Sequence, residues 1–152
     1  MFDDDDSGES ADVVCVKDGK HALEIEFYHC KFAKGIRVGT RVEDLYEVCG
    51  QAQKSVQWAA NPEDLFDHLQ KREPRTSKKT GQEISRFEHG TLNVLKMLRN
   101  KSMNLPVKFR ISIVQPGVSK AKATNEQLSL LAVTEDYLRD TYNIPFGVIC
   151  SH

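Results

Sequence analysis

The sequence predicts an α/β protein whose mixed central β-sheet starts with an antiparallel hairpin and is flanked by helices. Two observations carry this prediction. Two segments have the character of strands, and the turn signal Asp18-Gly19 separates them: 11–17 contains an apolar run, and 22–33 alternates apolar and polar residues. Further along the chain, segments with helical spacing alternate with segments of strand spacing, and this order favours a mixed sheet with helices packed around it.

The hairpin leads into two predicted helices. Thr40 and Glu43 have the spacing of a capping box, which predicts a helix over 40–58. Pro62 suits the first position of a second helix over 62–72, because proline needs no hydrogen-bond partner for its nitrogen there. The rest of the chain predicts a polar loop over 73–86, a helix over 90–101, a strand over 107–114 that ends at Pro116-Gly117, one or two helices over 124–142, and a buried strand over 146–150.

The length of 152 residues fits one domain over 1–152, in which residues 1–8 form an acidic leader. No apolar run is long enough to span a membrane, and the acidic N-terminus differs from a signal peptide, so we expect a cytoplasmic protein without a membrane partner. A strand begins within a dozen residues of Met1. This leads us to expect a part of a longer multidomain protein, whose other domains would be partners; an oligomer stays open.

The net charge of −1 conceals an uneven distribution of acids and bases. Six acids lie within residues 1–12, whereas residues 89–125 contain seven bases and no acid. Acids that hold a divalent cation beside bases that hold phosphates would suit a metal-dependent enzyme acting on a polyanion, although a solvated loop and an acidic linker would give the same pattern. The candidate nucleic-acid contacts are Lys71, Arg72, Lys96, Arg99, Lys101, Lys108, Arg110 and Lys120.

The hairpin gathers the residues with the clearest chemistry. Asp12 opens its first strand, and the second strand closes with His29 and Lys31. Because the chain turns near Gly19, both ends lie at the open end of the hairpin, and residues two apart share one face of a strand. A carboxylate, an imidazole and an ammonium are therefore expected near a common point.

These residues resemble the PD-(D/E)xK nuclease superfamily, and in particular its restriction-endonuclease-like and Mrr-like members. The resemblance rests on Asp12, the strand lysine Lys31 and a following helix that bears Gln51. The stretches GESADVV, FYHCK, YEVCGQAQKS and VQPGVSKA are also similar to a nuclease-type domain at the C-terminus of bacterial helicase-like proteins. The resemblance implies a restriction-endonuclease-like fold over roughly residues 9–150. It further implies Mg²⁺- or Mn²⁺-dependent cleavage of DNA, more than RNA, within a helicase-type or defence-related protein.

Carried over residue by residue, the resemblance makes Asp12 the central metal ligand and Glu9 the acid that completes the metal shell. Lys31 would orient the attacking water and stabilise charge on the phosphoryl group. Gln51 would help to place the water, the lysine or the substrate. All of these roles are implications of the family pattern.

The chain departs from that pattern at His29, where the family carries an acid two residues before the lysine. Three alternatives follow. His29 could itself be a catalytic metal ligand, which would favour Mn²⁺ because Mg²⁺ prefers oxygen ligands. The acid could instead come from Glu9, Asp6 or Glu47. In the third alternative the site is inactive, and the chain is a nucleic-acid-binding or assembly domain with a nuclease-like fold.

Overall fold

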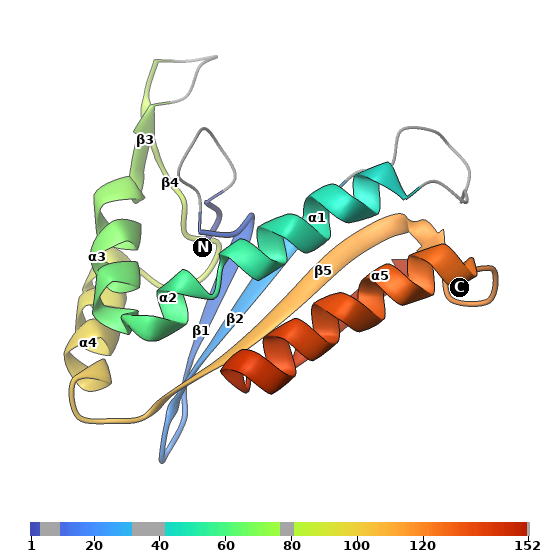
Figure 1. Ribbon diagram of the computed structural model, residues 1–152. Coiled ribbons are helices and arrows are strands. Elements are labelled where there is room, and N and C mark those ends of the chain that lie inside the picture. The colour runs from blue at the N-terminus through green and yellow to red at the C-terminus, as the bar shows by residue number, and fades with distance from the viewer. Residues whose placement is uncertain (4–9, 32–41, 77–80, 152) are drawn as a thin grey trace.

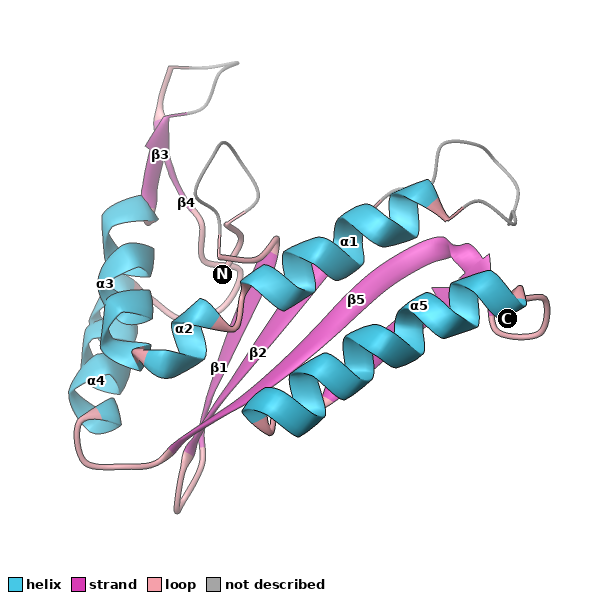
Figure 2. Cartoon of the chain, viewed as in Figure 1, coloured by secondary structure: helices cyan, strands magenta, loops and turns pink. Residues whose placement is uncertain are grey.

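A computed structural model describes residues 1–3, 10–31, 42–76 and 81–151 of the chain (Figure 1). Its main sheet has four strands in the order β1-β2-β5-β6. These are β1 (Val13–Asp18), β2 (Leu23–Cys30), β5 (Val107–Ser119) and β6 (Phe146–Ser151). β1 and β2 are antiparallel, whereas β5 is parallel to both β2 and β6. The predicted α/β class and the mixed sheet that begins with a hairpin are thus confirmed (Figure 2).

The turn of this hairpin depends on Gly19. A Cβ atom at this position would lie 2.5 Å from the carbonyl oxygen of Ala22, too close for any side chain. The tight turn fixes the register of the two strands, in which Asp18 faces Leu23 and Val13 faces Tyr28. The strand alternation seen in the sequence therefore becomes a defined inner and outer face.

The helices follow the predicted order with different boundaries. The predicted helix over 40–58 is divided into α1 (Glu43–Lys54) and the short α2 (Gln57–Ala60). The N-cap of α1 is Val42, which forms no side-chain capping hydrogen bond, so the predicted capping box with Glu43 does not form. Thr40, the predicted capping residue, lies outside the described residues. The remaining helices are α3 (Pro62–Arg72), α4 (Leu92–Ser102) and α5 (Asn125–Asp136), which continues into a π-helical turn, η1 (Tyr137–Thr141).

Two predictions are wrong, one about a loop and one about the end of a strand. The polar segment predicted as a loop contains two short antiparallel strands, β3 (Pro74–Thr76) and β4 (Glu83–Ser85). β5 also continues past Pro116 to Ser119, across a register irregularity against β6. An irregularity tolerates proline, which cannot donate a backbone hydrogen bond, and so the strand need not end there.

The sheet is covered on one face. Along β2, Leu23, Ile25 and Phe27 are buried, whereas Glu24 on the opposite face is exposed and lines an open hollow over the sheet. Helices α1 and α5 lie side by side over the buried face (Figure 1). The helices predicted to flank the sheet are therefore present, and α1 and α5 cover one of its faces. The alternation of acids with apolar residues in β2 is the pattern of a sheet with one solvated face.

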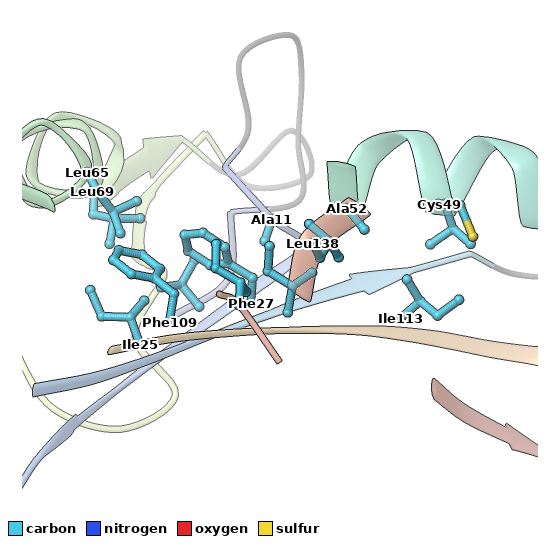
Figure 3. Packing of buried hydrophobic residues seen from close by; sticks show 14 of the residues in the cluster. Ala11, Ile25, Phe27, Cys49, Ala52, Leu65, Leu69, Phe109, Ile113 and Leu138 are labelled. Carbon is cyan, nitrogen blue, oxygen red and sulfur yellow. The ribbon is translucent and has the colours of Figure 1, made fainter. Parts of the chain in front are cut away.

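The core lies between the buried face of the sheet and the helices. At one end of the sheet, Leu65 and Leu69 of α3 approach Ile25 (Figure 3). At the other end, Cys49 and Ala52 of α1 lie over the sheet near Ile113 (Figure 3). This packing holds α1 across the C-terminal end of β2. Across the described residues, no helix is both long and apolar enough to cross a bilayer.

Candidate active site at the open end of the hairpin

Asp12 is fixed at the open end of the hairpin. The register of β1 and β2 carries Asp12 to a position opposite the end of β2, because Val13 pairs with Tyr28. There the Asp12 Oδ2 atom accepts a hydrogen bond of 2.6 Å from the backbone N–H of Cys30. The strand end that bears Lys31 and the carboxylate of Asp12 are thus held next to each other, as the hairpin pattern predicts.

Lys31 connects this strand end to helix α1. Its ammonium forms an ion pair with the carboxylate of Glu47. The hydrogen bond to Glu47, reinforced by the negative charges of Glu47, Asp44 and Asp12, raises the pKa of Lys31 above its ordinary value. Lys31 therefore remains protonated at neutral pH, in a field set by three carboxylates from two segments of the chain.

His29 points into the interior instead. Its side chain is buried between β2 and α1, and its Nε2 atom lies 2.6 Å from the Ser55 Oγ atom. Ser55 Oγ in turn lies 2.8 Å from the backbone carbonyl oxygen of Gln51 and donates its single proton to it. Since that proton is used, the Nε2–H of His29 must be the donor to Ser55. Burial lowers the pKa of His29 to about 4, so the ring is neutral at neutral pH.

The structure consequently does not bring the His29 Nε2 atom together with Asp12 and Lys31. A metal ligand needs a free lone pair, and this nitrogen carries the hydrogen that Ser55 accepts. His29, two residues before Lys31, thus connects β2 to the C-terminal end of α1 through its hydrogen bond with Ser55. Of the three predicted sources of an acid, Glu47 is the one that contacts Lys31, whereas Glu9 and Asp6 lie outside the described residues.

A row of polar residues on α1 lies along the end of β2. Glu47, Gln51 and Ser55 follow one another at intervals of four residues, which places them on one side of the helix. Glu47 contacts Lys31 and Ser55 contacts His29, so Gln51 lies between these two contacts. The Oε1 atom of Gln51 is buried without a hydrogen-bond partner.

The oxygen atoms at this site are of the type that Mg²⁺ and Mn²⁺ bind. These ions prefer carboxylate and amide oxygens, which Asp12, Glu47 and Gln51 carry. Across the described ranges, no three His, Cys, Asp or Glu side chains group closely enough to hold an ion by themselves. The amide oxygen of Gln51 has unused acceptor capacity and lies on the same side of α1 as Glu47.

Three of the predicted phosphate-binding bases are paired with acids inside the protein. Arg72 binds Asp3, and Lys101 binds Asp18. The Arg99 Nε atom lies 2.5 Å from a carboxylate oxygen of Asp67. These acids are distant in the sequence from the basic segments, so composition alone did not indicate the pairing.

The remaining predicted bases are distributed over several elements. Lys108 and Arg110 lie on the open face of the sheet, in register with Glu24 and Glu26 of β2 respectively. Lys71 of α3 and Lys96 of α4 are exposed, as is Lys120 beyond the end of β5. Lys108 and Arg110 thus share the open face with the glutamates of β2, whereas Lys71, Lys96 and Lys120 lie on other parts of the chain.

A second polar cluster is centred on Asp3, a residue that the sequence assigned to the acidic leader. Its side chain is fully buried and accepts hydrogen bonds from Ser10, His68 and Arg72. Burial by itself would raise the pKa of Asp3, but the hydrogen bonds from His68, Ser10 and Arg72 lower it to about 2. Residues 1–3 thus belong to the folded domain. No sequence signal distinguishes Asp3 from the aspartates that follow it.

Comparisons of the chain with models of protein families, with curated proteins and with solved structures find no match.

Proposed function

We propose that this chain is a nuclease domain with a restriction-endonuclease-like site, which cleaves DNA phosphodiester bonds with Mg²⁺ or Mn²⁺ as part of a helicase-type or defence-related protein. One observation carries the proposal. The protonated Lys31 lies at the open end of the hairpin, paired with Glu47 and within the field of Asp12 and Asp44. An ammonium beside carboxylates that can bind a divalent ion is the arrangement that metal-assisted phosphodiester hydrolysis uses.

Each residue has a role that its position supports. Asp12 and Glu47 would hold the metal ion, with the amide oxygen of Gln51 as a further ligand. Glu47 would thereby supply the acid that His29 does not. A bound divalent ion lowers the pKa of a water molecule and neutralises charge on the phosphate. Because Lys31 keeps its proton, it would stabilise the negative charge that develops on the phosphoryl oxygens and would not act as a base.

A DNA-cleavage assay tests this proposal. The 152-residue chain is incubated with supercoiled plasmid and with linear duplex in Mg²⁺, in Mn²⁺ and in EDTA. We expect metal-dependent cleavage that falls by at least about 100-fold in Asp12→Asn, Glu47→Gln and Lys31→Ala, the range typical of lost charge stabilisation at an active site. Lys17→Ala is the matched control, because Lys17 also forms an exposed ion pair, with Glu26 on the open face of the sheet, and is not a candidate DNA contact. Cleavage that survives in Glu47→Gln would show that the acid comes from elsewhere.

The ion pairs that the predicted phosphate-binding bases form inside the domain favour a second candidate function. In it, the chain is an assembly domain with a nuclease-like fold and no nuclease activity. Arg72, Arg99 and Lys101 are held by acids within the domain, which leaves fewer bases for a DNA backbone. For this candidate we expect no cleavage in any metal. We also expect no binding of Mn²⁺ that depends on Asp12 and Glu47, which titration calorimetry measures.

A further inference from the structure

In the described part of the chain, β6 forms an edge of the sheet that has no charge, no proline and no strand on its outer side. Its partner is β5 on one side, and in the described part of the chain no strand pairs with its other side. The strand reads FGVICS and contains no charge and no proline. Val148 is 36% exposed and Ile149 is 51% exposed, and these neighbours point to opposite faces of the sheet. Edge strands that stay single are usually protected by charges, proline or a covering segment.

The opposite edge of the same sheet has such protection. Along β1, the backbone of Met1 and Phe2 pairs with Val13 and Val14. Lys17, which points from β1 to the open face, forms an ion pair with Glu26. Among the described residues, one edge is therefore covered and charged, whereas no strand pairs with the other edge, which carries apolar side chains.

Helix α5, which connects β5 to β6, also presents apolar residues to solvent. It directs Gln127 and Thr134 into the interior and exposes Leu128 at 52% and Val133 at 62%. Leu130 and Leu131 pack against the core, so Leu128 and Val133 lie on the part of the helix that is turned to solvent. At its C-terminal end a single base, Arg139, pairs with three acids, Glu135, Asp136 and Asp140, so this end of the helix keeps a negative charge.

We propose that β6 pairs with β6 of a second copy of this chain, antiparallel and about a two-fold axis, so that the two sheets join into one. The self-complementary character of the strand favours a second copy as the occupant. In a two-fold pair the strand faces itself, and any charge on it would face a like charge. The absence of charge in FGVICS removes that penalty. Pairing would also bury Val148 and Ile149 and bring the two α5 helices to the junction. This proposal does not rest on the nuclease activity.

In the joined sheet, the direction of the strands determines how the candidate active sites of the two copies are oriented. β2 and β6 are both parallel to β5, so the two strands run in the same direction. An antiparallel β6 pair therefore reverses the direction of β2 between the copies. The Lys31 ends of the two copies would point in opposite directions, and each site would remain open to solvent.

Sedimentation equilibrium of the 152-residue chain tests the proposal. We expect the wild type to be a dimer, and we expect Ile149→Lys and Ile149→Glu each to raise the dimer dissociation constant by at least about tenfold, because each variant places a charge in the strand pair near the like charge of the other copy. An equimolar mixture of the two variants should restore the dimer, since opposite charges then meet. Val94→Lys serves as the control, because Val94 is 41% exposed on α4, away from the sheet edge.

Circular dichroism of both Ile149 variants establishes that they are folded. If one of them does not fold, Val148→Lys replaces it in the same series. A wild type that is monomeric at every concentration would overturn the proposal and assign the edge to a different chain. A dimer that persists with both like charges in place would overturn it as well.

Discussion

The buried imidazole of His29 makes the stability of this protein depend on pH in a range where most proteins change little. In the folded state the pKa of His29 is about 4, because burial disfavours the charged ring, whereas the ordinary value is 6.5. Between these two values the unfolded chain binds a proton that the folded protein does not bind. The free energy of unfolding must therefore decrease as the pH falls through this interval.

The magnitude follows from the difference between the two pKa values. One pKa unit corresponds to about 1.36 kcal/mol, so this difference corresponds to about 3 kcal/mol. His29 contributes this stability fully above pH 6.5 and loses it progressively as the pH falls toward 4. A loss of this size is a substantial part of the stability of a typical domain, which is about 5–15 kcal/mol.

Urea unfolding at a series of pH values between 7.5 and 4.5 measures this effect. The comparison is with His29→Gln, in which the amide can still donate to Ser55 but does not titrate. We expect the wild type to lose stability with falling pH more steeply than His29→Gln does. His21→Gln is the matched control, because His21 is exposed at the turn of the hairpin. Equal pH dependence in wild type and His29→Gln would refute the reasoning.

Two further predictions concern the stability of the fold. Asp3→Ala should lower the free energy of unfolding by about 3 kcal/mol in chemical denaturation, because it leaves Arg72 and Ser10 without their buried partner; a loss below about 1 kcal/mol would contradict this. Thr124→Ala should cost about 1 kcal/mol in the same measurement, because Thr124 and Gln127 form a capping box at the start of α5, whereas Thr141→Ala should change little.

Local patterns in the sequence were sufficient for the hairpin and for the meeting of Asp12 with the end of β2. An apolar run in the first strand, alternation of apolar and polar residues in the second and a tight turn at Gly19 together fix both strands and their register. The helix that begins at Pro62 was predictable for the same reason, since proline and helical spacing act within a few residues. These features depend on the backbone and on near neighbours.

Only the tertiary structure decided which charged groups meet. Glu47 was one of several candidate acids, and it contacts Lys31 because core packing sets α1 across the end of β2. Lys101 finds Asp18 across 83 positions of the chain, and Asp3 becomes buried because α3 brings Arg72 to it. Sequence periodicity reports which face of an element is apolar, but the partners of a charge depend on how the elements pack. For that reason the sequence by itself determined the hairpin and its open end, whereas the structure determined the residues gathered around Lys31.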